Sequence, residues 1–159
     1  MPNIIQNVSS GAVQLTPNFH LSEFVVSSNA TRLGIDNTPN PLATQALFKT
    51  AALMELVRKL LGGKVIIVNS GFRSTALNRA MGGAAVSQHL LGEACDFLCP
   101  SFGTPLQVAT AIANSSIKFG QLIQEFGDWV HISVPSSQFN RDILTASFIG
   151  GKANYRKGL

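Results

Sequence analysis

Apolar and polar positions follow a helical period in some segments of the chain and a strand-like pattern in others. The longest helical pattern begins at the capping residue Asn40, continues through Pro41, and ends at Gly62-Gly63. Its apolar positions at helical spacing are Leu42, Ala46, Leu53, Leu56, Val57, Leu60 and Leu61. We expect this helix to be the spine of the hydrophobic core.

Shorter helices are predicted from similar local signals. One covers Leu21 to Ser28 and opens at Ser22, one follows the cap Ser74 as far as Met81, and one runs from Thr104-Pro105 to about Ser115. The segment 29–40 is rich in Asn, Thr, Gly and Pro, and this composition predicts a surface loop.

Runs of β-branched and other apolar residues predict the strands. They cover 64–69, as a buried strand, then 93–98, 121–126, 129–134 and 144–149, the last as an edge strand. The short turn Gly127-Asp128 favours an antiparallel hairpin between two of them. The expected fold is α+β, a mainly antiparallel sheet with helices packed on one side.

Length and composition indicate one globular domain. A chain of 159 residues, 45% hydrophobic and 13% charged, is large enough for a core and too sparsely charged for a disordered protein. We divide it into an N-terminal helix and loop (1–40), a core (41–150) and a basic tail (151–159). Cys95 and Cys99 would lie about 13 Å apart on an extended strand, so we expect free thiols in a reduced compartment.

The charge pattern limits the partners. The formal net charge is +4, but only Lys152, Arg156 and Lys157 gather, and the sequence shows neither the dense basic face nor the known motif that is usual for nucleic-acid binding. A mildly basic surface suits an anionic polymer such as a bacterial cell wall, and it equally suits plain solubility. Met1 to Gln14 lacks the pattern of a secretory signal, and no apolar run is long enough to span a bilayer. We therefore expect synthesis in the cytosol and no membrane insertion.

Two of the three histidines stand in contexts typical of metal ligands. His89 and His131, with Asp96, offer two imidazoles and a carboxylate, and three protein ligands with a fourth position for water are the layout of a catalytic zinc site. Asp128, three residues before His131, is the candidate base for the water. On a strand, Asp96 shares its face with Ala94, whereas Cys95 faces the helices. On a flat strand, Asp128 would point to the face opposite His131. It can reach the metal only if it lies on the bend where this strand begins.

Simpler interpretations stay open for each residue alone. His89 could be a surface or turn histidine, His131 a buried histidine satisfied by backbone, and Asp96 a strand-end carboxylate. Arg73 could form a surface ion pair, for example with Glu93. Glu125, on the strand before the turn, is the rival base, although a structural ion pair is its simpler role. His20 is expected to be a surface or capping residue.

The motif Ser87-x-His89-x-x-Gly92-x-Ala94-x-Asp96, followed by Asp128-Trp129-Val130-His131, resembles the signature of the zinc D-Ala-D-Ala carboxypeptidase and L-alanyl-D-glutamate endopeptidase family. The segments Leu21-Ser22-Glu23-Phe24, Arg32 to Asn37, Ser70 to Ser74 and Gln121-Leu122-Ile123 are similar to its small phage and prophage members. The resemblance implies the hedgehog-like zinc peptidase fold, in which His89, Asp96 and His131 hold one zinc ion.

The same resemblance implies roles for the other residues. Asp128 matches the general base, Arg73 an arginine that binds the substrate carbonyl and the developing oxyanion, and Ser87 a residue that contacts the substrate or orients the first histidine. Trp129 is expected to be a packing wall of the site that can stack on substrate.

The leading hypothesis is a monomeric zinc metallopeptidase that cuts an amide bond in the peptide stem of peptidoglycan. A phage or prophage protein of this kind would reach the wall (the periplasm) after phage-mediated release or in a virion. The alternative is an inactive, zinc-stabilised wall-binding or virion structural module. The stem bond, carboxypeptidase against endopeptidase action, the host, and a role in lysis or entry stay open.

Overall fold

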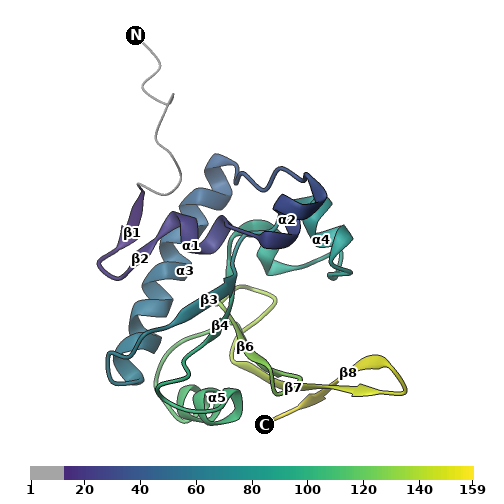
Figure 1. Cartoon of the computed structure of the whole chain (residues 1–159). Helices are drawn as coiled ribbons and strands as arrows, with labels where there is room; N and C mark the ends of the chain where they lie inside the picture. Colours follow the sequence, from purple (N-terminus) through teal and green to yellow (C-terminus); the bar gives the residue numbers. More distant parts are fainter. Residues whose placement is uncertain (1–12) are drawn as a thin grey trace.

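A six-stranded mixed sheet forms the centre of the molecule, in a computed structural model that describes residues 13–159 (Figure 1). Its strands lie in the order β3 (Ile67–Ser70), β4 (Ala94–Leu98), β6 (Trp129–Ser133), β5 (Gln121–Glu125), β7 (Asp142–Ile149) and β8 (Lys152–Lys157). All neighbours are antiparallel except β5 and β7, which are parallel. A separate small hairpin pairs β1 (Gln14–Thr16) with β2 (Phe19–His20). The predicted α+β class is confirmed.

The helices begin where local capping residues place them. They are α1 (Leu21–Val25), α2 (Ser28–Leu33), α3 (Pro41–Leu60), α4 (Thr75–Ala80), the 3-10 helix η2 (Gln88–Leu91) and α5 (Pro105–Ala113). The side chains of Asn40, Ser74 and Thr104 each accept a hydrogen bond from the backbone N–H three residues on. The three helix starts predicted from these caps are confirmed.

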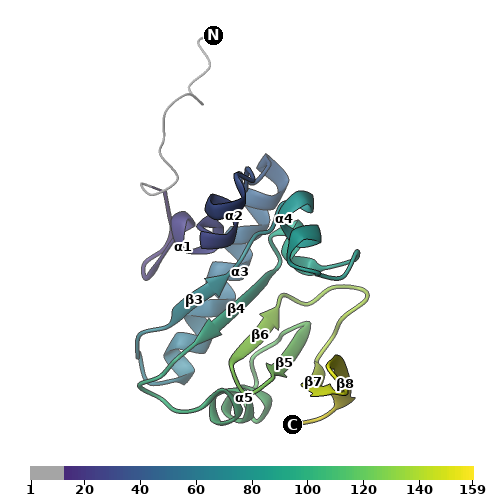
Figure 2. The ribbon, with the colours of Figure 1, turned by 45° about the vertical axis from the view of Figure 1, so that its right-hand side comes forward.

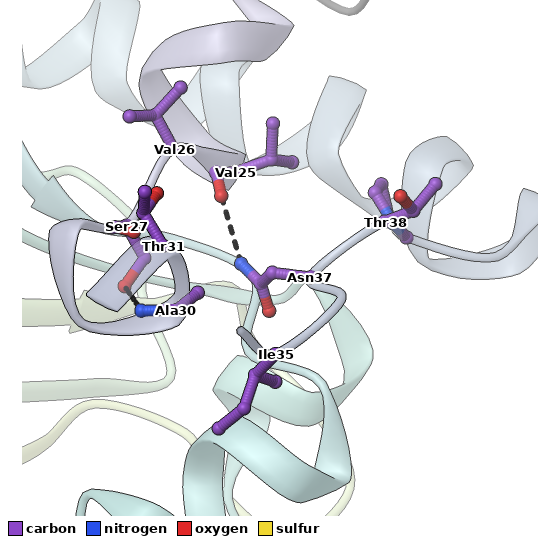
Figure 3. Close-up of a pocket in the computed structure, with 9 residues that line it drawn as sticks. Val25, Val26, Ser27, Ala30, Thr31, Ile35, Asn37 and Thr38 are labelled. Carbon is purple, nitrogen blue, oxygen red and sulfur yellow. Dashed lines mark hydrogen bonds between the residues drawn. The ribbon is translucent and has the colours of Figure 1, made fainter. Parts of the chain in front are cut away.

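The segment 29–40, predicted as a loop, begins with most of α2. Ser27 caps this helix by accepting a hydrogen bond from the Ala30 N–H, and Gly34, with φ of 64°, ends it. Asn37 then donates a hydrogen bond to the Val25 carbonyl, beside a cavity of about 250 Å³ lined by α1, α2 and the loop (Figure 3). The cap at Ser27 outweighs the loop-like composition.

Two strand predictions also need correction. β3 alternates between exposed and half-buried residues because only β4 pairs with it, so it is not the buried strand that was expected. β7 is not an edge strand, because residues predicted as a basic tail form β8 and pair with it along its length. Figure 1 shows this β7–β8 hairpin projecting beyond the rest of the sheet.

The core lies between one face of the sheet and the helices α3 and α5 (Figure 2). Leu47, Met54 and Val57 of α3 meet Cys95, Phe97, Val130 and Ile132 of the sheet. Each fully buried large side chain of this kind contributes about 1.5–3 kcal/mol. Of the predicted spine, Leu42, Leu56 and Leu60 are exposed, because the buried stripe of α3 runs through Leu47 and Met54.

Cys95 and Cys99 are buried free thiols. In the described part of the chain, α3 and the other helices are too short or too polar to cross a membrane. The prediction about a signal segment falls mostly on residues 1–12, which lie outside the described residues.

Candidate metal centre and active site

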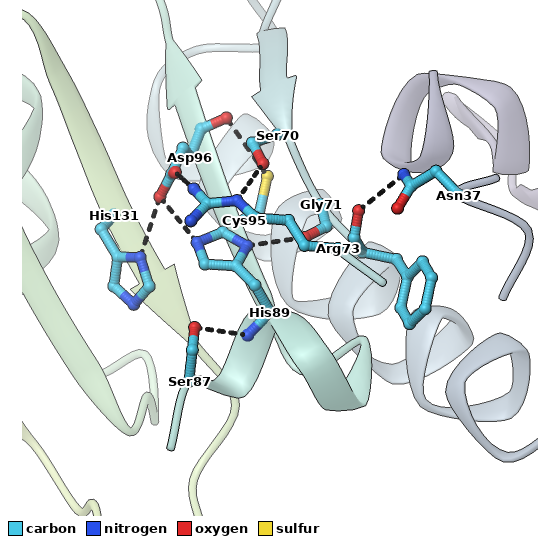
Figure 4. A network of polar contacts seen from close by, with 10 residues as sticks. Asn37, Ser70, Gly71, Arg73, Ser87, His89, Cys95, Asp96 and His131 are labelled. Atoms are coloured by element: carbon cyan, nitrogen blue, oxygen red, sulfur yellow. Dashed lines mark hydrogen bonds and ion pairs between the residues drawn. The ribbon is translucent and has the colours of Figure 1, made fainter. Parts of the chain in front are cut away.

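Three side chains from separate parts of the chain meet on the sheet face opposite the core. The Oδ1 atom of Asp96 lies 2.8 Å from His131 Nδ1 and 3.2 Å from His89 Nε2 (Figure 4). One ligand atom from each residue lies within 4.8 Å of the others, and all three residues are buried. The structure therefore brings together the three predicted ligands around a space that one metal ion can fill.

Strand register places two of these ligands side by side. Asp96 of β4 is the direct partner of His131 of β6, so their side chains leave the sheet on the same face. Cys95 points into the core, as its strand parity predicted. Burial and the neighbouring Asp96 raise the pKa of the Cys95 thiol well above its ordinary value, so it is not available as a thiolate ligand.

The backbone of the β3–α4 loop orients His89. The ring Nδ1–H donates to the Gly71 carbonyl at 2.6 Å, which turns Nε2 toward Asp96 Oδ1. The Arg73 N–H in turn donates to the His89 carbonyl. Gly71 is required by packing, since a Cβ atom there would lie 2.6 Å from the Phe24 carbonyl oxygen.

The helix that carries His89 is fixed at both ends. Ser87 caps η2, and its Oγ accepts a hydrogen bond from the His89 N–H. Gly92 ends η2 with φ of 74°, and its carbonyl accepts a hydrogen bond from Thr50 of α3 at 2.7 Å. This anchoring explains why His89 is a buried ligand candidate and not a turn histidine.

Arg73 holds the second oxygen of the Asp96 carboxylate. Its Nη2 lies 2.8 Å from Asp96 Oδ2, and its Nε donates to Ser70 Oγ at 3.0 Å. The ion pair is therefore made with Asp96 and not with Glu93. Burial opposes ionisation of Asp96, but the charges of His89 and His131 and their hydrogen bonds outweigh it and hold the pKa well below its usual range.

The two candidate bases lie in different environments. Asp128 is exposed in the turn between β5 and β6. Glu125 pairs with Trp129 across the strands, lines the site cavity, and is only partly exposed. Burial and the charge of Asp96 raise the pKa of Glu125, while His131, Arg73 and the Trp129 indole partly offset the rise. Of the two candidates, Glu125 lines the cavity that contains the metal ligands, and Asp128 does not.

A cavity of about 680 Å³ surrounds the ligands. Ser87 and Trp129, the two predicted substrate-binding residues, line it together with residues of β5, β7 and β8. Among the described residues, the buried Trp129 Nε1 makes no hydrogen bond of standard length. A second cavity of about 290 Å³ adjoins it on the β3 side and shares Arg73, Met81, Asp96 and Trp129.

The donor set fits zinc. Two imidazoles and one carboxylate, with one imidazole held by a backbone carbonyl and the carboxylate held by an arginine, form the inner and outer parts of a catalytic zinc site. Sequence reasoning missed Gly71 and the cavity residues of β8. Glu125 was recognised only as the rival base. It lies two residues after Ile123, the strand partner of His131, and therefore on the same face of the sheet as His131.

The comparisons with known proteins agree with this geometry. The family model described as Peptidase M15 matches residues 17–133, which include all three ligands, Arg73, Glu125 and Asp128. No curated protein matches the chain.

Proposed function

The chain belongs to the peptidase M15 family and is a zinc metallopeptidase, and from this premise we propose that it hydrolyses an amide bond in the peptide stem of peptidoglycan. The observation that carries the proposal is the convergence of His89, Asp96 and His131 in the lining of a cavity of about 680 Å³. We assign the zinc ion to these three residues, one ion per chain.

When bound, a zinc ion would act as a Lewis acid and lower the pKa of the water that it holds to about 7. In the proposal, Glu125 accepts a proton as water attacks the carbonyl carbon, and returns it to the nitrogen when the C–N bond breaks. A stem carboxylate and an amine are the products. Asp128 stays a candidate for the same role, but its exposed position in the turn favours Glu125.

We assign substrate contacts to three further residues. Arg73 lines both cavities, and its guanidinium can donate to the substrate carbonyl through Nη1, the nitrogen that binds neither Asp96 nor Ser70. Ser87 and Trp129 line the cavity beside the ligands and support the substrate backbone. We also propose that the protein acts as a monomer.

Zinc removal tests the reaction. Purified peptidoglycan is incubated with the protein, and the released fragments are identified by mass spectrometry. We expect new amino and carboxyl ends at one stem bond, loss of their release with a chelator, and recovery with zinc. Release that is indifferent to chelation would contradict the proposal, and fragments cut in the glycan would assign a different bond. Zinc-loaded protein that binds the wall without cutting it would be the inactive module.

We extend the proposal to a phage or prophage protein that degrades the wall of its host, on the basis of the motifs shared with small phage members. Expression in a bacterium together with a membrane-permeabilising protein is expected to cause lysis, whereas expression of His131→Ala with the same partner is not. Equal lysis by both would contradict this role.

A further inference from the structure

The β7–β8 hairpin lies outside the residues that the family model matches, yet it forms one side of the site cavity. Pairing across three strands puts Glu125, Ala146 and Tyr155 in one row, so their side chains share a face. Ala146, the middle residue of this row, is small and buried. Phe148 and Ala153 form the next row on that face and also line the cavity.

Three aromatic rings cover this side of the cavity, and we call Phe126, Phe148 and Tyr155 the aromatic wall. The rings of Phe126 and Phe148 stack with centroids 4.2 Å apart, and Phe126 also meets Trp129 edge-on at 5.9 Å. Phe126 adopts φ of 57°, a conformation rare for a residue with a side chain, in the turn that carries it.

The wall is not part of the core. Phe148 is 64% exposed and Tyr155 53% exposed, although both adjoin a continuous cavity that reaches the metal ligands. Aromatic side chains left open beside a catalytic site are available to a ligand. Burial and the nearby carboxylates of Glu125 and Asp96 raise the pKa of Tyr155, so its hydroxyl stays protonated and can donate a hydrogen bond.

The chemistry of the wall differs from that of the β3 side. Within the described chain, β7 and β8 contribute only uncharged residues to the cavity lining, namely Leu144, Phe148, Ala153 and Tyr155. The register turns Lys152 and Arg156 toward the opposite face, and Lys157 pairs with Asp142. The adjoining cavity has more polar and charged residues in its lining, namely Ser27, Asn29, Asn69, Ser70, Arg73 and Asp96, beside Leu77, Met81 and Trp129.

We propose that the aromatic wall binds a sugar ring of the glycan strand, while the polar β3 side receives the charged stem peptide. This inference rests on the proposed function. Sugar rings are the uncharged cyclic part of peptidoglycan, and their C–H groups complement the negative face of aromatic rings. The enzyme then prefers a stem that is still attached to glycan over the same peptide free in solution.

Binding of the peptide-free disaccharide of the glycan tests the wall without any turnover. Trp129, the single tryptophan, lines the same cavity, so its fluorescence reports binding. We expect a saturable change in the full-length zinc-loaded protein. Phe148→Ala and Tyr155→Ala should each weaken binding about fivefold, and Tyr155→Phe, which keeps the ring, about twofold. Phe48→Ala, an exposed phenylalanine of α3 away from the cavity, is the matched control.

Turnover provides the second measurement. The ratio of kcat/KM for the disaccharide-linked stem to that for the free stem should fall about fivefold in Phe148→Ala. Absence of disaccharide binding, or equal binding by all variants, would overturn the inference, and so would an equal loss with the free stem, which would assign the wall to peptide. Disaccharide binding that depends on the wall in a protein that cuts no stem would uphold the inference and reject the proposed function.

Discussion

At the scale of single residues, the face of a strand is the basis on which we propose Glu125 as the catalytic base. Glu125 and Trp129 are strand partners, and Ile123 and His131 are the next pair on the same face, so Glu125 leaves the sheet beside the ligands. Asp128 follows the left-handed residues Phe126 and Gly127, which carry the chain away from the sheet into an exposed turn. The spacing in the sequence predicts Asp128 as the base, whereas the positions of the two residues in the structure lead us to propose Glu125.

Replacement of each carboxylate by its amide tests this assignment. We expect Glu125→Gln to lower kcat on peptidoglycan fragments by about 10²–10⁴-fold, because an amide cannot accept the proton of water. Asp128→Asn, the matched control, should stay near the unsubstituted rate. The zinc content of both variants, measured by elemental analysis, should remain one ion per chain. The reverse order of activities would restore Asp128 as the base.

The ligands could be predicted from the sequence, but the backbone group that orients the His89 ring could not. His89, Asp96 and His131 are chemically distinctive residue types, and strand parity alone separated Asp96 from Cys95. The carbonyl of Gly71 that orients His89 belongs to a backbone group, and the need for glycine there comes from Phe24, far away in sequence. Such contacts depend on packing between distant segments, which local patterns do not encode.

At the scale of elements, local capping signals determine where helices begin, whereas pairing between strands determines which segments join the sheet. The caps Asn40, Ser74 and Thr104 act within one helical turn, so the sequence predicts these helix starts correctly. β8 consists of exposed residues without an apolar period, and only its pairing with β7 makes it a strand. The sheet order and the hairpin beside the active site were therefore beyond prediction from periodicity.

One carboxylate of α3 forms hydrogen bonds to the small β1–β2 hairpin, whose Leu15 and Phe19 also pack into the core. Glu55 accepts hydrogen bonds from the Thr16 hydroxyl, the Asn18 N–H and the Asn18 side-chain amide, at 2.8–2.9 Å. Burial opposes its ionisation, but these hydrogen bonds outweigh it and lower the pKa of Glu55 below its ordinary value of 4.5. A lowered pKa in the folded state means that the charged form stabilises the fold.

We expect Glu55→Ala to lower the free energy of unfolding at pH 7 by about 0.5–1 kcal/mol, a modest value because the carboxylate is near solvent. The contribution of Glu55 is complete above its unfolded pKa of 4.5 and is lost as pH falls through its lower folded pKa. The difference between the two proteins should therefore shrink toward pH 3. Urea unfolding at both pH values measures it, and a difference that grows in acid would contradict the charge-based role.

At the scale of the whole molecule, the metal centre joins segments that lie far apart in the sequence. His89 comes from η2, Asp96 from β4 and His131 from β6, while Arg73 and Gly71 connect the β3–α4 loop to the same cluster. The carboxylate of Asp96 is buried among these groups, and a bound cation would compensate its charge further. Metal binding should therefore stabilise the entire domain.

The thermodynamic linkage between zinc binding and folding gives the size of this stabilisation. Free zinc at about 1,000 times its dissociation constant stabilises the folded state by about 4 kcal/mol. In a domain of this size, each kcal/mol raises the melting temperature by about 2–4 °C, so saturating zinc should raise Tm by about 8–16 °C. Calorimetry of the metal-free and zinc-loaded protein measures the shift. His131→Ala should lose most of it, and Glu125→Gln should keep it, because Glu125 is assigned to the proton and not to the metal. A shift of equal size in His131→Ala would place the zinc at another site.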